Sequence, residues 1–285
     1  MPGNIALVDV FKPHMDGTVV EVNERMEICN IIPGALQTEE FDYKGKYKTV
    51  NVYSFQADYL QNWVGVEVDK LAIGNGASEI IAAIKRTVLT RMTVAVPTFN
   101  EYYDGLPDHK INFYHSEPND FTIDLLGFAE SVEQSGSNVA VLVNPDLPSG
   151  LMVKKPDLAK LLHRLAHLDL VLVDESFIDF AGTEEENSLI ADLELYPNLL
   201  VIRSLSKDLG VPGLRLGYAA SSNQSLVNLL RREMPIWNIN GLAEYFLAVL
   251  PKYRREFEES RRQVIADREY FYARLIEVPG IGITI

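Results

Sequence analysis

The sequence predicts an α/β fold in which helices cover both faces of a mostly parallel β-sheet. From about Leu71 onward, short apolar runs alternate with segments that have helical periodicity. The apolar runs are continuous, and such runs are typical of parallel strands that are buried on both faces. Hydrophobic residues make up 47% of the 285 residues and charged residues 23%, so the chain can bury a large core. A sheet layered by helices satisfies these observations together.

The expected elements follow in order along the chain. Residues 4–24 and 48–60 predict strands and turns that do not belong to this sheet pattern. Residues 156–168 carry leucines at helical spacing, with Pro156 at a position suited to the first turn of a helix. Residues 252–277 predict a long amphipathic helix, with arginines and glutamates on one side and aromatic and aliphatic residues on the other. The predicted buried strands are residues 139–143, 170–174, 199–203 and 214–221.

The bulk composition excludes several classes of protein. A net charge of -14 argues against nucleic acid and anionic membranes as partners, because both select basic surfaces. Cys29 is the only cysteine, which excludes an intramolecular disulfide and a cysteine-rich zinc site, and no metal site is predicted. No apolar run approaches the roughly 18 to 20 residues that span a bilayer, and the N-terminus lacks the features of a signal peptide. We therefore expect a cytoplasmic protein.

The segment SLSKDLGVPGLRLG, residues 204–217, carries the strongest indication of chemistry. A lysine on a glycine-rich turn, such as Lys207, can lose its proton and form an imine with an aldehyde cofactor. Ser204 and Ser206 before it and Arg215 after it can hold a phosphate. Taken alone, such a short motif is more often a solvated lysine in a polar loop. The order of four upstream motifs instead favours a cofactor-binding lysine. These motifs are GNGASEII, VPTFNEYY, NPDLPSG and VDESFIDF.

These five motifs stand in the order and approximate spacing of the fold-type-I pyridoxal-phosphate enzymes. From residue 75 to residue 218 the sequence resembles the class I/II aminotransferases, most closely the branch of histidinol-phosphate aminotransferases and threonine-phosphate decarboxylases. The resemblance implies pyridoxal 5'-phosphate as the cofactor, a homodimer, and a large cofactor-binding domain over residues 61–250. It also implies that residues 251–285 are a connecting helix and the start of a truncated C-terminal small domain.

The resemblance assigns a role to each motif. Asp174 ends a predicted strand, and in this family the aspartate bonds the protonated pyridine nitrogen, so that the ring absorbs electrons from a substrate carbanion. Phe99 occupies the place where the family stacks an aromatic ring on the cofactor, although most phenylalanines simply belong to a core. Free N–H groups at the start of a helix favour an anion. The predicted phosphate-binding residues are Gly76, Ala77, Ser78, Ser204, Ser206 and Arg215.

Two residues depart from the family pattern. Where the family has an asparagine that bonds the cofactor's phenolic oxygen, this chain has Leu147. Where many relatives have a tyrosine that bonds the same oxygen, it has Phe177, which still counts among the predicted cofactor-binding residues. The loss of a buried hydrogen bond weakens binding by on the order of 1 to 3 kcal/mol. Cofactor binding is therefore better supported by the sequence than turnover.

The N-terminal residues 1–60 resemble a different family. The segments MDGTVV, residues 15–20, and VNVYSF, residues 50–55, are similar to the later part of sugar-phosphate and phosphocholine nucleotidyltransferases. The resemblance implies a partial nucleotidyltransferase-like segment fused to the aminotransferase, as in bifunctional cytidylyltransferase/transaminase enzymes of 2-aminoethylphosphonate metabolism. Such a domain also needs a glycine-rich triphosphate loop, and none precedes these residues, so we expect an incomplete chain.

The resemblance implies an aminotransferase that moves an amino group between a small amino acid or aminophosphonate and a keto acid, phosphonopyruvate being one candidate. Lys207 serves in this hypothesis both as the cofactor-binding amine and as the general base. A threonine-phosphate-type decarboxylase uses the same lysine, aspartate and phosphate site and stays open, as does a scaffold of reduced activity. Trp237 and Asn238 are candidates for substrate contact, and a helix start with a core tryptophan is an equal alternative.

Overall fold

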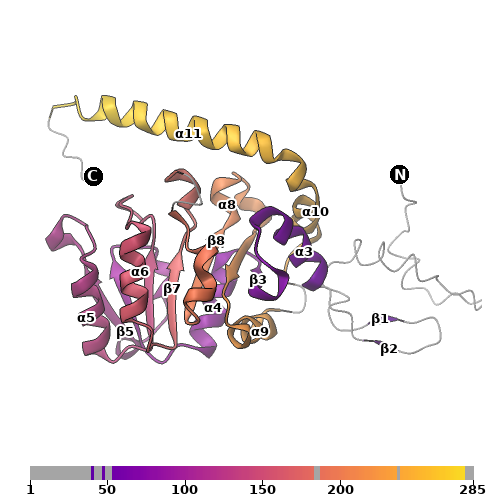
Figure 1. Cartoon of the computed structure of the whole chain (residues 1–285), viewed down its shortest axis with the longest axis horizontal. Coiled ribbons are helices and arrows are strands. Elements are labelled where there is room, and N and C mark those ends of the chain that lie inside the picture. The colour runs from indigo at the N-terminus through magenta and orange to yellow at the C-terminus, as the bar shows by residue number, and fades with distance from the viewer. Residues whose placement is uncertain (1–39, 42–46, 49–52, 183–186, 236–237, 280–285) are drawn as a thin grey trace, which may run out of the picture.

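The computed structural model describes residues 40–41, 47–48, 53–182, 187–235 and 238–279. Its centre is a seven-stranded sheet with the strand order β3-β9-β8-β7-β6-β4-β5 (Figure 1). Strands β8, β7, β6, β4 and β5 run parallel to one another, and β9 runs antiparallel to both of its neighbours. The prediction of a mostly parallel sheet is confirmed. The strands are β3 (Leu71–Gly74), β4 (Met92–Val96), β5 (Ile111–His115), β6 (Val139–Val143), β7 (Leu170–Asp174), β8 (Leu199–Ser204) and β9 (Gly217–Ala220).

Three of the four predicted strands agree with β6, β7 and β8, and the fourth is shorter than expected. The prediction for residues 214–221 extends too far toward the N-terminus, because Pro212–Leu214 forms a 3-10 turn (η7) before β9. Arg215, which follows this turn, has a φ of 55° and so cannot belong to an extended strand. The phosphate-binding candidate Arg215 therefore lies on a turn at the start of β9.

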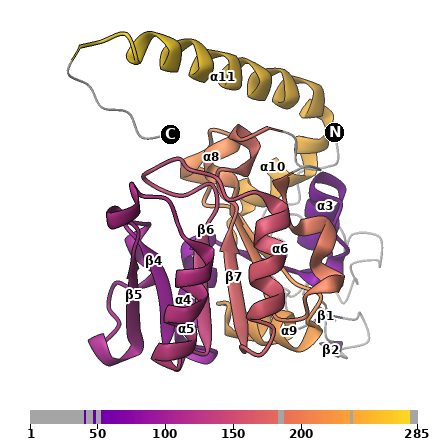
Figure 2. The ribbon, with the colours of Figure 1, turned by 60° about the vertical axis from the view of Figure 1, so that its left-hand side comes forward.

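Helices cover both faces of the sheet and bury two separate apolar clusters (Figures 1 and 2). Because successive side chains of a strand point to opposite faces, Val171 and Val173 pack into one cluster while Leu170 and Leu172 pack into the other. This alternation explains why the strands are continuous apolar runs. The first face carries α3 (Tyr53–Val64), α5 (Leu125–Ser135), α6 (Lys155–Arg164) and α10 (Gly241–Val249), and the second carries α4 (Ala77–Thr87) and α9 (Gln224–Glu233).

The helix predicted over residues 156–168 is α6, which has Pro156 in its first turn as expected. It ends at Arg164, earlier than the apolar pattern suggests. Leu165 and Leu168 follow the helix but remain buried in the core, so their periodicity continues past the last helical turn. Burial, rather than helical conformation, accounts for the extra leucines.

The prediction of strands and turns over residues 48–60 is wrong for its second half, where α3 begins at Tyr53. Ala57, Leu60 and Trp63 recur every three residues and are all buried in the cluster that covers β3. A helix places all three on one face, whereas a strand cannot. Residues 4–24 lie outside the described residues, as does Cys29. The only described part before α3 is an antiparallel pair, β1 (Glu40–Phe41) with β2 (Tyr47–Lys48).

The predicted C-terminal helix is α11 (Arg254–Leu275), which lies across one edge of the sheet in Figure 1. Its contacts with the body include an ion pair of 3.2 Å between Arg261 and Asp179. None of its residues is buried, and the aromatic side chains of Tyr270 and Phe271 are exposed. The helix is confirmed, and its first turns contact the core through Phe257, whose ring meets Trp63 edge-on at 5.1 Å between centres. No described helix is both long and apolar enough to span a membrane.

Candidate active site at the carboxyl ends of the strands

The predicted catalytic residues meet at the carboxyl edge of the parallel strands, where ligands bind in open α/β sheets. Asp174 is the last residue of β7, and β8 leads through Ser204 into the short helix α8 (Leu205–Asp208), which carries Lys207. The positive charge of Lys207 is near enough to lower the pKa of the Asp174 carboxyl. Lys207 Nζ also lies 5.8 Å from the ring centre of Phe177. The chain thus brings together an exposed lysine, a buried carboxylate and an aromatic ring.

Asp174 is 5% exposed, and both of its carboxylate oxygens accept hydrogen bonds. The hydroxyl of Tyr102 donates to Oδ2 at 2.6 Å, and the backbone N–H of Ser176 donates to Oδ1 at 2.9 Å. Burial raises the pKa of Asp174, while hydrogen bonds from the Ser176 hydroxyl, the Tyr102 hydroxyl and the Ser176 N–H, together with the charge of Lys207, oppose that effect. The carboxylate is therefore fixed in orientation inside an apolar surrounding, as a partner for a cationic ring nitrogen requires.

The predicted phosphate-binding residues of α4 and β9 lie against each other. Gly76 precedes α4 with a φ of 87°, and a Cβ atom there would overlap the guanidinium of Arg215. A Cβ atom on Gly217 would overlap the backbone nitrogen of Ala77 and lie 2.7 Å from the carbonyl carbon of Gly76. The absence of side chains at Gly76 and Gly217 lets the start of α4 lie directly beside β9 and Arg215. The first N–H groups of a helix have no acceptor within the helix, so Ala77 and Ser78 offer donors at this point.

The hydroxyl of Ser206 is an unsatisfied donor in the same part of the molecule. Ser206 is 5% exposed, and its Oγ atom is buried with no hydrogen-bond partner among the described residues. Such a group costs free energy unless a ligand or water pairs with it. Ser204 contributes differently, because its backbone N–H donates to the Ser176 hydroxyl at 2.8 Å and fixes α8 to the end of β7. Arginine side chains, hydroxyl groups and the N–H groups at the start of a helix are the kinds of group that bind phosphate in proteins.

Phe99 lies on the loop after β4, next to the residue that bonds Asp174. Its ring is 36% exposed and meets the Tyr102 ring edge-on, with 6.3 Å between centres. Lys85 of α4 holds this loop by donating to the carbonyl oxygens of Glu101 at 2.7 Å and Asp104 at 2.8 Å. Phe99 is therefore available to cover a bound ring, on a loop that is anchored from the helix of the predicted phosphate site.

Leu147 and Phe177 supply no polar group, as their side chains imply. Leu147 packs against the apolar cluster beneath α4, and the Phe177 ring is tilted against Phe180 at 6.3 Å between centres. The neighbouring amide of Asn144 is engaged, since it donates to the Val153 carbonyl at 3.1 Å and accepts from the Val153 N–H at 2.7 Å. Asn144 therefore holds its own loop in shape and is not a free partner for a ligand.

A buried ionic network supports α8 from behind. Glu175 is 1% exposed and pairs with Arg203 at 2.9 Å, and it also accepts a 2.6 Å hydrogen bond from Ser188. Asp208 follows Lys207 and faces this network, and burial together with the charge of Asp179 raises its pKa to about 7. A cavity of about 300 Å³ adjoins these carboxylates and Arg203. The short helix that carries Lys207 therefore packs against charged groups, and their ionisation affects the stability of the fold at this point.

The hypothesis that Asn238 contacts a substrate is not supported. Asn238 is 2% exposed and donates its side-chain amide to the carbonyl of Ile73 at 2.5 Å, which ties it to β3 in the core. This agrees with the alternative that the segment is structural. Trp237 lies outside the described residues.

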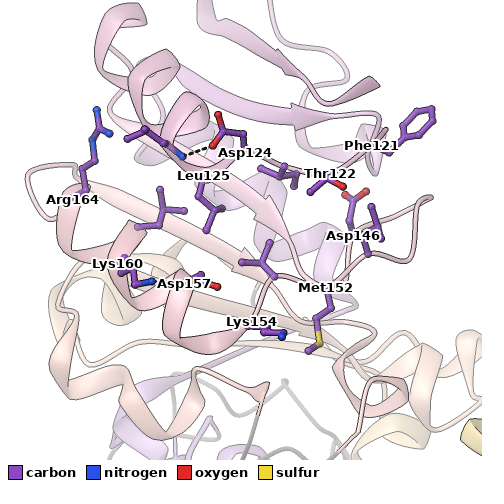
Figure 3. Close-up of a pocket in the computed structure, with 15 residues that line it drawn as sticks. Phe121, Thr122, Asp124, Leu125, Asp146, Met152, Lys154, Asp157, Lys160 and Arg164 are labelled. Carbon is purple, nitrogen blue, oxygen red and sulfur yellow. Dashed lines mark hydrogen bonds and ion pairs between the residues drawn. The ribbon is translucent and has the colours of Figure 1, made fainter. Parts of the chain in front are cut away.

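A cavity of about 710 Å³ lies apart from Lys207, between the starts of α5 and α6 (Figure 3). Several of its charged groups have partners. Asp124 accepts from the Leu126 N–H at 3.1 Å, and Asp157 pairs with Lys160 at 2.7 Å. Asp146 lines the cavity and belongs to the loop that also carries Leu147. The cavity adjoins the predicted site but includes none of its predicted residues.

Residues 46–285 match the family model described as aminotransferase class I and II. The chain belongs to this family. Its members depend on pyridoxal phosphate, so the cofactor implied by the sequence is confirmed at the level of the family. The buried carboxylate, the lysine turn and the close approach of α4 to Arg215 agree with that cofactor.

Three relatives show where the chain stands within the aminotransferase family. It is 38% identical over 215 residues to a CMP-5'-(3-aminopropyl)phosphonate synthase of Streptomyces rubellomurinus, covering 75% of this chain and 34% of the relative. It is 32% identical over 224 residues to an L-serine phosphate decarboxylase of Sulfurospirillum multivorans, covering 76% of this chain and 57% of the relative. The crystal structure of a histidinol-phosphate aminotransferase from Clostridium acetobutylicum superposes with a TM-score of 0.73 at 25% identity, covering 88% of this chain and 72% of that one. The chain spans less than two thirds of either curated relative.

Sequence reasoning missed three residues that shape this candidate site. Tyr102 bonds Asp174, and its place three residues after Phe99 was the available signal, since a helical turn brings such residues to one side. Ser176 secures both Asp174 and Ser204, and its position two residues after Asp174 suits a local side-chain to backbone turn. Gly217 permits the close approach of α4, which no local pattern in the sequence indicates.

Proposed function

We propose that this chain binds pyridoxal phosphate and catalyses transamination between a small amino acid or an aminophosphonate and a keto acid. The observation that carries the proposal is the buried Asp174 carboxylate, held by two donors beside Lys207. A buried carboxylate of fixed orientation is costly to maintain, and a cationic ring nitrogen compensates for that cost. The family relationship supports the same reaction class.

The cofactor, when bound, supplies an aldehyde that links covalently to an amine and a ring that accepts electrons from the substrate α-carbon. In the proposal, Lys207 Nζ binds that aldehyde and later removes the proton from the substrate α-carbon. Asp174 accepts a hydrogen bond from the protonated ring nitrogen. Phe99, from the loop after β4, and Phe177, from the turn after β7, would contact the ring; they lie beside Tyr102 and Lys207 respectively.

The proposed phosphate site combines the orphan hydroxyl of Ser206, the guanidinium of Arg215 and the first N–H groups of α4. Gly76 is part of it because its lack of a Cβ atom leaves room for Arg215. Ser204 belongs to the same turn and orients α8 through its bond to Ser176. The members of the proposed site are Gly76, Ala77, Ser78, Ser204, Ser206 and Arg215.

Decarboxylation of a phosphorylated amino acid is the second candidate. It is supported by the 32% identity to the L-serine phosphate decarboxylase, which spans 76% of this chain. It needs the same lysine, aspartate and phosphate site, and differs in which bond to the α-carbon is broken. A scaffold of reduced activity, to which Leu147 and Phe177 point, is the third outcome to be distinguished.

We further propose that the whole protein is a fusion with a nucleotidyltransferase and forms a homodimer in the cytoplasm. The 38% identity to a CMP-phosphonate synthase about three times as long as the matched segment supports the fusion. The structure alters the division of the chain proposed from the sequence at residue 60, because α3 starts at Tyr53 and packs into the core. We place the end of the nucleotidyltransferase-like part before α3. Residues 251–285 remain proposed as the link to a further C-terminal domain.

Product analysis tests the reaction. The full-length protein is supplied with pyridoxal phosphate, a phosphonate or phosphate amino acid labelled at its carboxyl carbon, and a keto acid. Transamination predicts a new keto acid and a new amino acid with the label retained. Release of labelled carbon dioxide without a keto acid indicates decarboxylation instead. A protein that binds the cofactor and forms neither product is a scaffold, and it contradicts both enzymatic proposals.

A further inference from the structure

The hydrogen bond between Tyr102 and Asp174 joins two motifs that the sequence keeps 72 residues apart. Tyr102 is 1% exposed and belongs to the 3-10 turn η2 (Asn100–Tyr102) after β4, while Asp174 ends β7. The 2.6 Å separation of Tyr102 Oη from Asp174 Oδ2 is short for a neutral donor and typical of a hydrogen bond to a carboxylate. Both groups are buried, so the bond acts at low dielectric.

The groups that face the Asp174 carboxylate come from three elements. Tyr102 reaches Oδ2 from η2, the Ser176 N–H reaches Oδ1 from the turn after β7, and Lys207 of α8 acts through its charge. Glu175 points to the other side of the strand end, where it pairs with Arg203. The Ser176 side chain also bonds Asp174, but it belongs to the turn that follows β7 directly, whereas Tyr102 donates from a distant loop, across β6.

Tyr102 remains a donor throughout the working range of pH. Burial, followed by the charge of Asp174 and the hydrogen bond to it, raises the pKa of the Tyr102 phenol well above its usual range. The phenol therefore does not ionise beside the carboxylate. A donor of fixed protonation lowers the affinity of Asp174 for a proton, and it does so even when nothing is bound.

We propose that Tyr102 is a positioning residue that keeps Asp174 ionised and thereby keeps the proton of the Asp174–cofactor hydrogen bond on the ring nitrogen. This inference rests on the proposed cofactor site. A carboxylate that has lost the Tyr102 donor binds a proton more tightly and competes with the ring nitrogen for it. Hydrogen bonds to charged groups alter such affinities by about 10- to 100-fold. The ring then loses positive charge and becomes a poorer acceptor of electrons.

The test uses Tyr102→Phe, which removes one oxygen atom and keeps the ring volume. The matched control is Tyr103→Phe in the next position, where the ring packs edge-on against Phe113 at 5.2 Å between centres and its hydroxyl is not one of the groups that bond Asp174. Both proteins are loaded with pyridoxal phosphate labelled with nitrogen-15 in the ring, and the nitrogen signal is followed by NMR. This signal distinguishes a protonated from an unprotonated ring and does not depend on turnover.

The parent protein and Tyr103→Phe are expected to show a protonated ring nitrogen, and Tyr102→Phe a signal moved toward the unprotonated form at the same pH. Affinity for pyridoxal phosphate is expected to fall about tenfold or more in Tyr102→Phe. Affinity for the analogue in which carbon replaces the ring nitrogen should stay unchanged. In an Asp174→Asn background, Tyr102→Phe should have no further effect on the nitrogen signal.

Two further outcomes decide against the inference. A nitrogen signal in Tyr102→Phe equal to that of the parent overturns it. A protein with p-aminophenylalanine at position 102 keeps a donor and should restore the protonated signal; if it behaves like Tyr102→Phe, the effect comes from packing. Failure of the parent to bind pyridoxal phosphate at all instead contradicts the proposed function, so the two failures are distinguishable.

Discussion

Replacement of Gly217 by alanine tests whether the proposed phosphate site depends on the close approach of α4 to β9. The added Cβ atom meets the backbone nitrogen of Ala77, the carbonyl carbon of Gly76 at 2.7 Å and Ala77 Cα at 3.0 Å. All three atoms belong to the backbone, so no side chain can rotate away to make room. Either α4 moves as a unit or β9 loses its register with β3.

The expected cost follows from this contact. Overpacking a buried position costs about 1 to 3 kcal/mol, and a collision with backbone alone places Gly217→Ala near about 3 kcal/mol in the free energy of unfolding. Displacement of the first turn of α4 also moves the N–H groups of Ala77 and Ser78 from the proposed phosphate position. We therefore expect affinity for pyridoxal phosphate to fall by at least about tenfold.

The assay compares urea unfolding and cofactor titration with those of Gly213→Ala, a control in the turn η7 that precedes β9. A Cβ atom on Gly213 has no atom within 4 Å, so this variant should stay within about 0.5 kcal/mol of the parent and bind the cofactor equally well. The reasoning is refuted if Gly217→Ala matches Gly213→Ala in both measurements. If Gly217→Ala loses stability but binds pyridoxal phosphate as tightly as the parent, the proposed phosphate site does not depend on the close approach of α4 to β9.

Two further predictions concern the ionic groups behind α8. Glu175→Gln removes the negative charge that lies 2.9 Å from the buried Arg203 and leaves Asp179, at 3.9 Å, as its remaining carboxylate partner. The free energy of unfolding should fall by about 3 kcal/mol in urea titrations, whereas a loss below about 1 kcal/mol contradicts this. Asp208 has its pKa raised from 3.8 to about 7 by burial and by Asp179, so its protonated form stabilises the fold fully below pH 3.8, and that contribution is lost as the pH rises through about 7. Asp208→Asn should therefore be more stable than the parent at about pH 8, by up to about 4 kcal/mol in the free energy of unfolding. This difference should shrink toward about pH 5. The same difference between variant and parent at both pH values would contradict the prediction.

The sheet was predictable because its strands are buried on both faces and therefore form continuous apolar runs in the sequence. Residues 139–143 and 170–174 coincide with β6 and β7 for this reason. The helix α3 was missed because its segment was interpreted through a resemblance to another family. The spacing of Ala57, Leu60 and Trp63 had indicated a helix. Local periodicity was the better guide there.

The candidate site was predictable in its residue types and less so in its contacts. Motif order placed Asp174, Lys207 and Arg215 at one edge of the sheet, since the carboxyl ends of parallel strands lie together. The donor to Asp174 could not be read from the sequence, because Tyr102 reaches it across β6 from the loop after β4. The contact of Gly217 with α4 is likewise set by tertiary packing rather than by local pattern.

The most direct measurement of the central claim is to identify the lysine that binds the cofactor. The protein is incubated with pyridoxal phosphate, reduced with borohydride to fix the cofactor on its lysine, and digested for peptide mass mapping. The control is Lys154→Ala, which removes an exposed lysine that precedes α6. The account predicts the added mass on Lys207 in the parent and in Lys154→Ala, and no stoichiometric label in Lys207→Ala. Stoichiometric label on any other lysine, or none in the parent, would contradict it.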